Sequence, residues 1–250
     1  MMVRHTMLFL GYELRSLLRN PVWPLFGIMQ PVLYLVFFAP LLRSTVPGGD
    51  MTDVLAMFTP GSMMMIALFG SMFAGFGLIN ETRNGVLERL AVSQAWRPAI
   101  ILGRLLKDVI VLILQAILVI GIAALMGLRI GVPEMVLVLL LMAATGLFAA
   151  SLSYGLALTL RDENGMSQVV QFFAMPLTLI AGLFLPISLG PQWLQTIAKF
   201  NPLYYAVEAG RSLFRGDLSA STIPIAFGLF VVLTALTLTW SVRSLGKLAG

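Results

Sequence analysis

The sequence of 250 residues contains no cysteine and a single histidine, His5. The lack of cysteine excludes disulfide bonds and thiolate metal sites, and one histidine does not make a histidine-based metal centre. Charged residues are also scarce, because Asp, Glu, Lys and Arg form 11% of the chain, whereas they form about a quarter of a soluble domain. We therefore predict a chain that lies largely in a membrane and binds no metal or cofactor of its own.

Ionisable side chains are absent from the middles of the long apolar runs. Ion-coupled carriers usually place such groups within their spans, and charged-ring channels and intramembrane hydrolases also need polar constellations there. A phosphate-binding loop is missing too, since Gly246-Lys247 is followed by Leu248 and lacks the upstream glycine. The chain is therefore not expected to be an enzyme, and uphill transport would need energy from another subunit.

Six continuous apolar runs dominate what is present, with 59% apolar residues and a mean hydropathy of +0.95. A membrane span needs roughly 20 mostly apolar residues, and continuous rather than alternating runs favour helices over a β-barrel. The predicted fold is an all-α polytopic membrane protein that forms a single transmembrane domain over residues 1–250. The six predicted spans are 22–42, 54–79, 108–126, 135–160, 167–185 and 223–242.

Basic residues alternate between the two sides of these spans. Eleven of the sixteen Lys and Arg residues fall on the side that holds both termini, and five fall on the other. The positive-inside rule then places both termini in the cytoplasm. The net charge of +5 is thus explained by membrane topology, and no nucleic-acid partner is expected.

The first 20 residues predict an amphipathic helix that lies in the cytoplasmic interface. Its apolar residues recur at helical spacing at Val3, Met7, Leu10, Leu14 and Leu17. We interpret this helix as an anchor, with bracing of a cytoplasmic partner as a second role.

The segment 80–107 is the most charged part of the chain. Glu81 and Glu88 share one helical face, while Val86, Leu87 and Leu90 form an apolar stripe. A short helix of this kind suits docking into a groove on another protein. A solvated loop that obeys the positive-inside rule is the alternative, and the spacing alone does not choose between them.

The segment 186–221 predicts two short helices on the outer side, separated at Asn201-Pro202. Glu208 and Arg211 are three residues apart and can pair on one face. We expect a re-entrant outer helical hairpin, which serves either as a cap that completes the fold or as an exit gate. The residues that define it are Pro186, Trp193, Asn201, Pro202, Tyr204, Tyr205, Glu208 and Arg211.

Small and soft side chains mark the second and fifth spans. Small residues four apart allow close helix contact, methionine gives an adaptable surface, and proline kinks a helix. We expect these positions to serve helix packing or a substrate path, and favour packing for the methionines. They are Met64, Ser71, Met72, Gly75, Phe172, Phe173 and Pro176.

Two stretches give the chain a family resemblance. Leu185-Pro186 through Asn201-Pro202 to Arg211 resembles the outer signature of the membrane subunits of type-2 ABC exporters, especially the drug-exporter permeases related to daunorubicin export. Glu81, Gly85, Leu87-Glu88 and Leu90, followed by Gly103-Arg104, are similar to the cytoplasmic coupling segment of that family.

The resemblance implies a permease of the bacterial plasma (inner) membrane that pairs with a second permease, either another copy or a related chain. Each would sit on a cytoplasmic ATPase that holds ATP and Mg²⁺, while the outer hairpins close the exit for drug-like or lipid-like cargo. The residues expected to meet the ATPase are Glu81, Gly85, Val86, Leu87, Glu88, Arg89 and Leu90.

Other functions remain open at this point. Within transport, the alternatives are a polysaccharide exporter and a sodium-extruding ABC permease. From another class, a non-transporting membrane scaffold explains the uncharged spans equally well.

Overall fold

A computed structural model describes residues 2–19, 22–43, 50–86 and 97–246, and all of the regular elements in these residues are helices. In chain order the elements are α1 Met2–Arg19, α2 Val22–Arg43, α3 Met51–Met72, α4 Ala74–Arg83, α6 Arg97–Leu125, α7 Val132–Leu160, α8 Glu163–Ile180, the 3₁₀ turn η1 Ile187–Leu189, α9 Gln192–Ala198, α10 Pro202–Phe214 and α11 Thr222–Gly246.

Among the described residues, four helical stretches are long and apolar enough to cross a membrane: Met51–Arg83, Pro98–Leu125, Val132–Leu160 and Thr222–Gly246. In α2 the apolar stretch Gly27–Leu41 is shorter, and α8 is an 18-residue helix. The chain is thus a multi-pass membrane protein, while the six-span topology stays a prediction.

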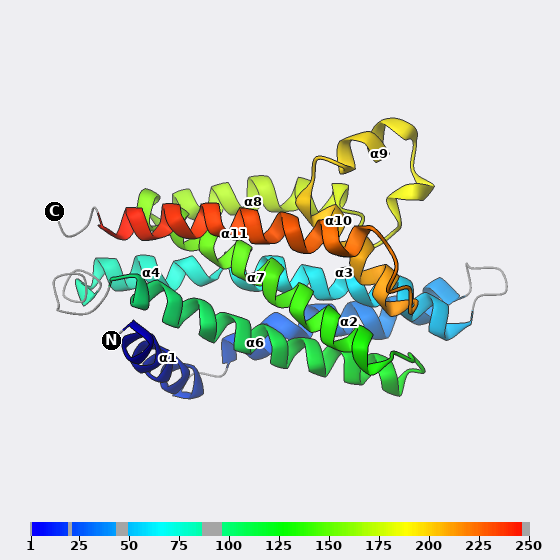
Figure 1. The fold of residues 1–250 in the computed structure, drawn as a ribbon, viewed down its shortest axis with the longest axis horizontal. Coiled ribbons are helices and arrows are strands. Elements are labelled where there is room, and N and C mark those ends of the chain that lie inside the picture. The colour runs from blue at the N-terminus through cyan, green and yellow to red at the C-terminus, as the bar shows by residue number, and fades with distance from the viewer. Residues whose placement is uncertain (1, 20–21, 44–49, 87–96, 247–250) are drawn as a thin grey trace.

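The long helices run along one axis, so their ends gather at two ends of the bundle (Figure 1). The termini end holds α1, the beginning of α6 and the end of α11. The loop end, opposite, holds the turn between α6 and α7 together with α9 and α10. The sequence places both termini on one side, and α1 and the end of α11 agree with that arrangement.

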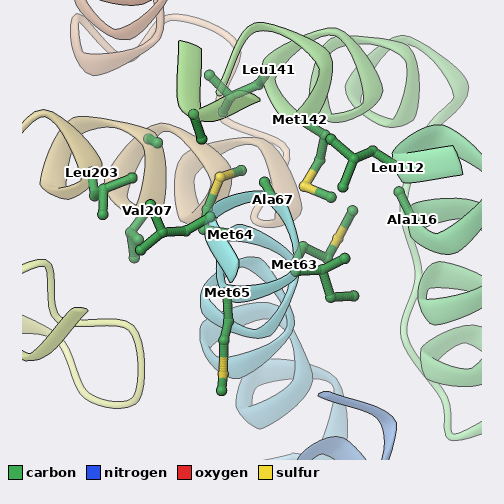
Figure 2. Close-up of a cluster of buried hydrophobic side chains, with 14 of the residues drawn as sticks. Met63, Met64, Met65, Ala67, Leu112, Ala116, Leu141, Met142, Leu203 and Val207 are labelled. Atoms are coloured by element: carbon green, nitrogen blue, oxygen red, sulfur yellow. The ribbon is translucent and has the colours of Figure 1, made fainter. Parts of the chain in front are cut away.

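Helix α3 lies in the middle of the bundle and contacts α2, α6, α7 and α10. Figure 2 shows its methionines pointing in different directions, with Met63 toward α6 and Met64 toward α7. The Thr145 hydroxyl of α7 lies 3.8 Å from the Met64 sulfur. Because unbranched methionine adapts to uneven gaps, it suits a helix that is surrounded on several sides.

The second predicted span is not one uninterrupted helix, since α3 ends at Met72 and α4 begins at Ala74. The Ser153 hydroxyl of α7 donates to the Met72 carbonyl at 2.6 Å and accepts from the Gly75 N–H at 3.0 Å. A Cβ on Gly75 would lie 2.6 Å from the Ser153 carbonyl oxygen, so only glycine allows this approach. The break is therefore fixed by a neighbouring helix rather than by a proline.

Two helix ends differ from the predicted spans. Helix α6 begins at Arg97, well before residue 108, because charged residues on one helix face are held by protein rather than by lipid. Helix α8 ends at Ile180 rather than near residue 185, and the chain then turns at Gly182 with a φ of 71°. A positive φ is readily adopted by glycine, which accounts for the early end.

Candidate functional site

A buried group of charges lies at the termini end, and we call it the ion-pair cluster: Glu13, Glu81, Arg104, Lys107 and Asp108. The Arg104 side chain is 6% exposed; its Nε lies 3.2 Å from Glu13 Oε1, and its Nη2 pairs with the Glu81 carboxylate. Lys107 Nζ lies 2.9 Å from Asp108 Oδ1 and 3.8 Å from Glu13 Oε2. Buried charges are tolerated only when they are paired, and here each basic group faces two carboxylates.

The cluster joins three helices and contacts a fourth. Glu13 comes from α1, Glu81 from α4, and the three remaining members from the first turns of α6, where their spacing places them on one face. The Tyr154 hydroxyl of α7 donates to the Asp108 carboxylate. A Cβ on Gly103 would lie 2.7 Å from the Phe9 Cβ, so α1 packs closely on α6. Helix α1 is thereby tied to α6, and through α6 to α4 and α7.

The structure changes the interpretation of Glu81. The sequence placed its carboxylate on a docking face with Glu88, whereas the structure turns it inward to Arg104 because a nearly buried guanidinium needs a counter-charge. Gly85 follows the end of α4 with a φ of 67°, and Val86 is exposed. The other predicted coupling residues, Leu87, Glu88, Arg89 and Leu90, lie outside the described residues.

A second, exposed set of ion pairs links the end of α4 to the beginning of α8. Arg83 lies 3.3 Å from Asp162 and 3.4 Å from Glu163. Asp162 also caps α8, since its carboxylate accepts from the Gly165 N–H at 2.8 Å. Pairs this exposed contribute little to stability, so the Arg83 pairs set orientation rather than hold the fold.

At the loop end, Arg211 of α10 is 1% exposed and donates to three separate acceptors. Its Nε lies 3.2 Å from the Met57 carbonyl of α3, its Nη1 lies 2.7 Å from Glu208, and its Nη2 lies 2.5 Å from the Gly182 carbonyl. The pairing of Glu208 with Arg211 confirms the prediction made from their spacing. Burial lowers the pKa of Arg211, and the Glu208 carboxylate opposes that shift.

Asn201 and Pro202 separate α9 from α10 as predicted. The Asn201 side chain accepts from the Leu203 N–H at 3.0 Å, which caps α10, and donates to the Leu177 carbonyl of α8 at 2.6 Å. Pro202 occupies the first turn, where its missing N–H costs nothing. This junction therefore fixes α10 to the end of α8.

The two short helices differ in surroundings. Helix α10 packs on α3, α7 and α11, while α9 stands off the bundle and exposes Trp193 (Figure 1). Pro186 immediately precedes η1. The Tyr205 hydroxyl donates to the Lys199 carbonyl, and the Tyr205 ring contacts the ring of Tyr204. Only part of the predicted hairpin is thus inserted among the long helices.

The predicted packing or path residues fall into two groups. Met64, Ser71, Met72 and Gly75 are buried in the core, while Phe172 and Phe173 are 72% and 53% exposed on α8, the helix that contains Pro176. Among the described residues, the two groups do not line a common cavity. Their part in a substrate path stays a prediction.

Sequence reasoning missed Glu13, Lys107, Asp108 and Tyr154 as members of one site. A signal was available in Arg104, Lys107 and Asp108, which share a helical face just before an apolar run. Within the described residues, no group of three His, Asp or Glu side chains is placed to hold a metal ion.

Comparison with known proteins agrees with these features. Residues 4–214 match the family described as ABC-2 type transporter. The chain is 24% identical over 226 residues to the daunorubicin resistance ABC transporter permease protein DrrB1 of Streptomyces coeruleorubidus, covering 84% of this chain and 76% of the relative.

Two further relatives are similarly distant. The putative transport permease ycf38 of Cyanophora paradoxa is 26% identical over 205 residues, covering 80% of this chain and 70% of the relative. The linearmycin resistance permease protein LnrN of Bacillus subtilis is 24% identical over 200 residues, covering 79% of this chain and 51% of the relative. With the family match spanning most of its length, the chain belongs to the ABC-2 type transporter family and is a membrane permease rather than an ATPase.

Proposed function

We propose that this chain is the transmembrane subunit of an ATP-driven exporter that moves hydrophobic or amphipathic, drug-like or lipid-like molecules out of the cell. ATP and Mg²⁺ would be bound by a separate cytoplasmic ATPase subunit. The proposal includes six spans, cytoplasmic termini and a place in the bacterial plasma membrane. It also includes pairing with a second permease.

The ion-pair cluster is the single observation that carries the coupling role. Arg104 pairs with both Glu13 and Glu81. Glu13 lies on α1, the helix predicted to brace a cytoplasmic partner, and Glu81 lies at the beginning of the predicted coupling segment. A force applied to either segment would therefore be transmitted to α6 through buried ion pairs. Through Asp108 and Tyr154 it would continue to α7.

The nature of the cargo is inferred from what the spans contain. Their middles have no ionisable residue, so a path between them suits apolar or amphipathic molecules rather than ions. Two relatives are described by resistance to daunorubicin and linearmycin, which supports a drug-like cargo. The exposed Phe172 and Phe173 of α8 offer an apolar face either to a second permease or to cargo that arrives from lipid.

Transport in vesicles tests the proposal. The chain and its co-purified ATPase are reconstituted, and ATP-dependent accumulation of a fluorescent anthracycline is compared with accumulation of sodium and of a labelled polysaccharide. The proposal predicts anthracycline accumulation that stops when ATP is withheld and continues when an uncoupler is added. Accumulation of sodium or polysaccharide instead would select an alternative cargo, and ATP-independent behaviour would contradict the exporter.

A further inference from the structure

A cavity of about 300 Å³ lies at the loop end, where α3 and α7 begin, α6 ends and α10 ends. Four charged side chains line it: Asp53, Arg129, Glu134 and Arg215. Its wall includes the buried apolar residues Leu213 and Phe214. Pockets that hold small molecules have volumes of about 300–1,000 Å³, so this cavity is at the lower end of that range.

These four charges have no ion-pair partner within the described part of the chain. Elsewhere, by contrast, Arg104 and Arg211 are each paired with a carboxylate. Two acids and two arginines thus line one cavity without forming ion pairs with each other, and Asp53, Arg129 and Arg215 are exposed there. A ligand that carries both signs of charge would complement all four.

Glu134 supplies the most specific feature of the cavity. It lies in the first turn of α7 and folds back toward the helix start, so that its Oε2 would lie 2.1 Å from a Cβ on Gly131. This oxygen is shielded from solvent and has no hydrogen-bond donor among the described residues. A shielded acceptor without a donor costs about 1–3 kcal/mol. A rotation of the half-buried Glu134 side chain toward the cavity would let a ligand N–H satisfy this oxygen.

Helix dipoles explain only part of this arrangement. Asp53 and Glu134 both lie in first helical turns, where a negative charge is favourable. That effect does not account for the unfilled Oε2, nor for two arginines facing the same cavity. Two guanidinium groups, in contrast, are well suited to a phosphate.

We propose that this cavity binds a zwitterion that carries a primary ammonium and a phosphate, the chemistry of a phosphoethanolamine group. Glu134 and Asp53 receive the ammonium N–H groups, and Arg129 and Arg215 receive the phosphate oxygens. The ends of the spans lie at the depth of lipid headgroups, so a phosphatidylethanolamine headgroup and a free phosphoethanolamine compound share this chemistry. A choline headgroup has no N–H to donate and is excluded by the Glu134 requirement.

The test compares lipids that differ only in the headgroup. The full chain is purified, incorporated into nanodiscs that contain equal amounts of phosphatidylethanolamine and phosphatidylcholine with the same acyl chains, and released for native mass spectrometry. We expect retained phosphatidylethanolamine to exceed phosphatidylcholine about tenfold, because only its ammonium donates to a carboxylate. Binding of free glycerophosphoethanolamine is measured in parallel by calorimetry.

The variants decide where binding occurs. Glu134→Gln, Asp53→Asn and the double variant Arg129→Gln with Arg215→Gln should each reduce the preference to about twofold or less, since each removes a charged partner. Lys199→Gln is the control, because Lys199 is exposed at the same end but does not line the cavity. Size-exclusion profiles verify that each variant is folded, and the comparison rests on those variants that keep the wild-type profile.

Each outcome is informative. A headgroup preference that the cavity variants abolish supports the proposal with lipid as the source. Calorimetric binding of glycerophosphoethanolamine that the same variants abolish supports it with a soluble source. Absence of both, or a preference that survives in all cavity variants, overturns it, and neither result depends on the cargo of the exporter.

Discussion

Arg104 is the residue on which the termini end depends most. Its guanidinium is nearly buried and lies between two carboxylates that belong to different helices. Replacing it by leucine would leave Glu13 and Glu81 without their main counter-charge. Loss of one member of a buried ion pair costs about 3–5 kcal/mol, whereas an exposed pair contributes about 1 kcal/mol or less.

We therefore predict that Arg104→Leu lowers the melting temperature of the purified protein strongly, while Arg83→Gln changes it little. Arg83 is a matched control because it also pairs with two carboxylates at the termini end but is half exposed. The measurement is loss of the monodisperse size-exclusion peak after heating. Equal melting temperatures for the two variants would contradict a structural role for the buried cluster.

A corresponding prediction concerns Arg211 at the loop end. Its three donors satisfy two carbonyl oxygens and one carboxylate, and a lysine ammonium cannot reproduce that planar fork. Arg211→Lys should thus destabilise the protein by about 1–3 kcal/mol, the cost of one unsatisfied buried acceptor. Arg215→Lys, at an exposed neighbouring position, should have no measurable effect on melting, and a similar loss in both variants would refute the argument.

At the scale of elements, the break between α3 and α4 is caused by a neighbouring helix and not by the local sequence. Neither proline nor glycine occupies position 73, and Ser153 of α7 supplies the missing hydrogen-bond partners. The close approach of α4 to α7 depends on Gly75, because a Cβ on this residue would clash with the Ser153 backbone.

Gly75→Ala is consequently expected to destabilise the protein by about 1–3 kcal/mol through overpacking. Gly77→Ala, two residues further along α4, meets nothing within 4 Å and should be neutral or stabilise by about 0.5–1 kcal/mol. Chemical or thermal unfolding in detergent distinguishes the two. If both alanines behave alike, the contact between α4 and α7 is not as close as described.

The sequence predicts elements that depend on local pattern and misses those that depend on contacts between distant segments. Apolar runs predict the long helices, Asn201-Pro202 predicts the boundary of α10, and the i, i+3 spacing predicts the Glu208–Arg211 pair. The ion-pair cluster could not be derived in this way, because its members come from α1, α4 and α6 and meet only in the folded protein.

The same limit applies to Glu81. Its spacing from Glu88 suggested a shared docking face, but its carboxylate pairs with Arg104, which is far away along the chain. The break at Phe73 was missed for a similar reason, since its cause lies in α7. The cavity at the loop end likewise combines residues from separate helices.

At the scale of the whole molecule, the positions of the helix ends make topology testable. Helix α1 lies at the opposite end of the bundle from the connection between α10 and α11 (Figure 1). The absence of native cysteine means that a single introduced thiol can be labelled without background.

With cytoplasmic termini, Ser219→Cys should react with a membrane-impermeant maleimide in intact cells, whereas Ser16→Cys should react only after permeabilisation. Both serines are exposed in the structure, so differences in labelling report sidedness. The opposite pattern would invert the proposed orientation, and labelling of both thiols in intact cells would contradict an even number of crossings.

The central claim is that this permease works with a separate ATPase, and it is tested most directly by purification from the native membrane in mild detergent followed by mass spectrometry of the bound proteins. The account predicts a stoichiometric subunit that carries a phosphate-binding loop, together with any second permease chain. Recovery of the chain without an ATPase in several gentle extractions would contradict the account and favour a scaffold or a carrier with another energy source.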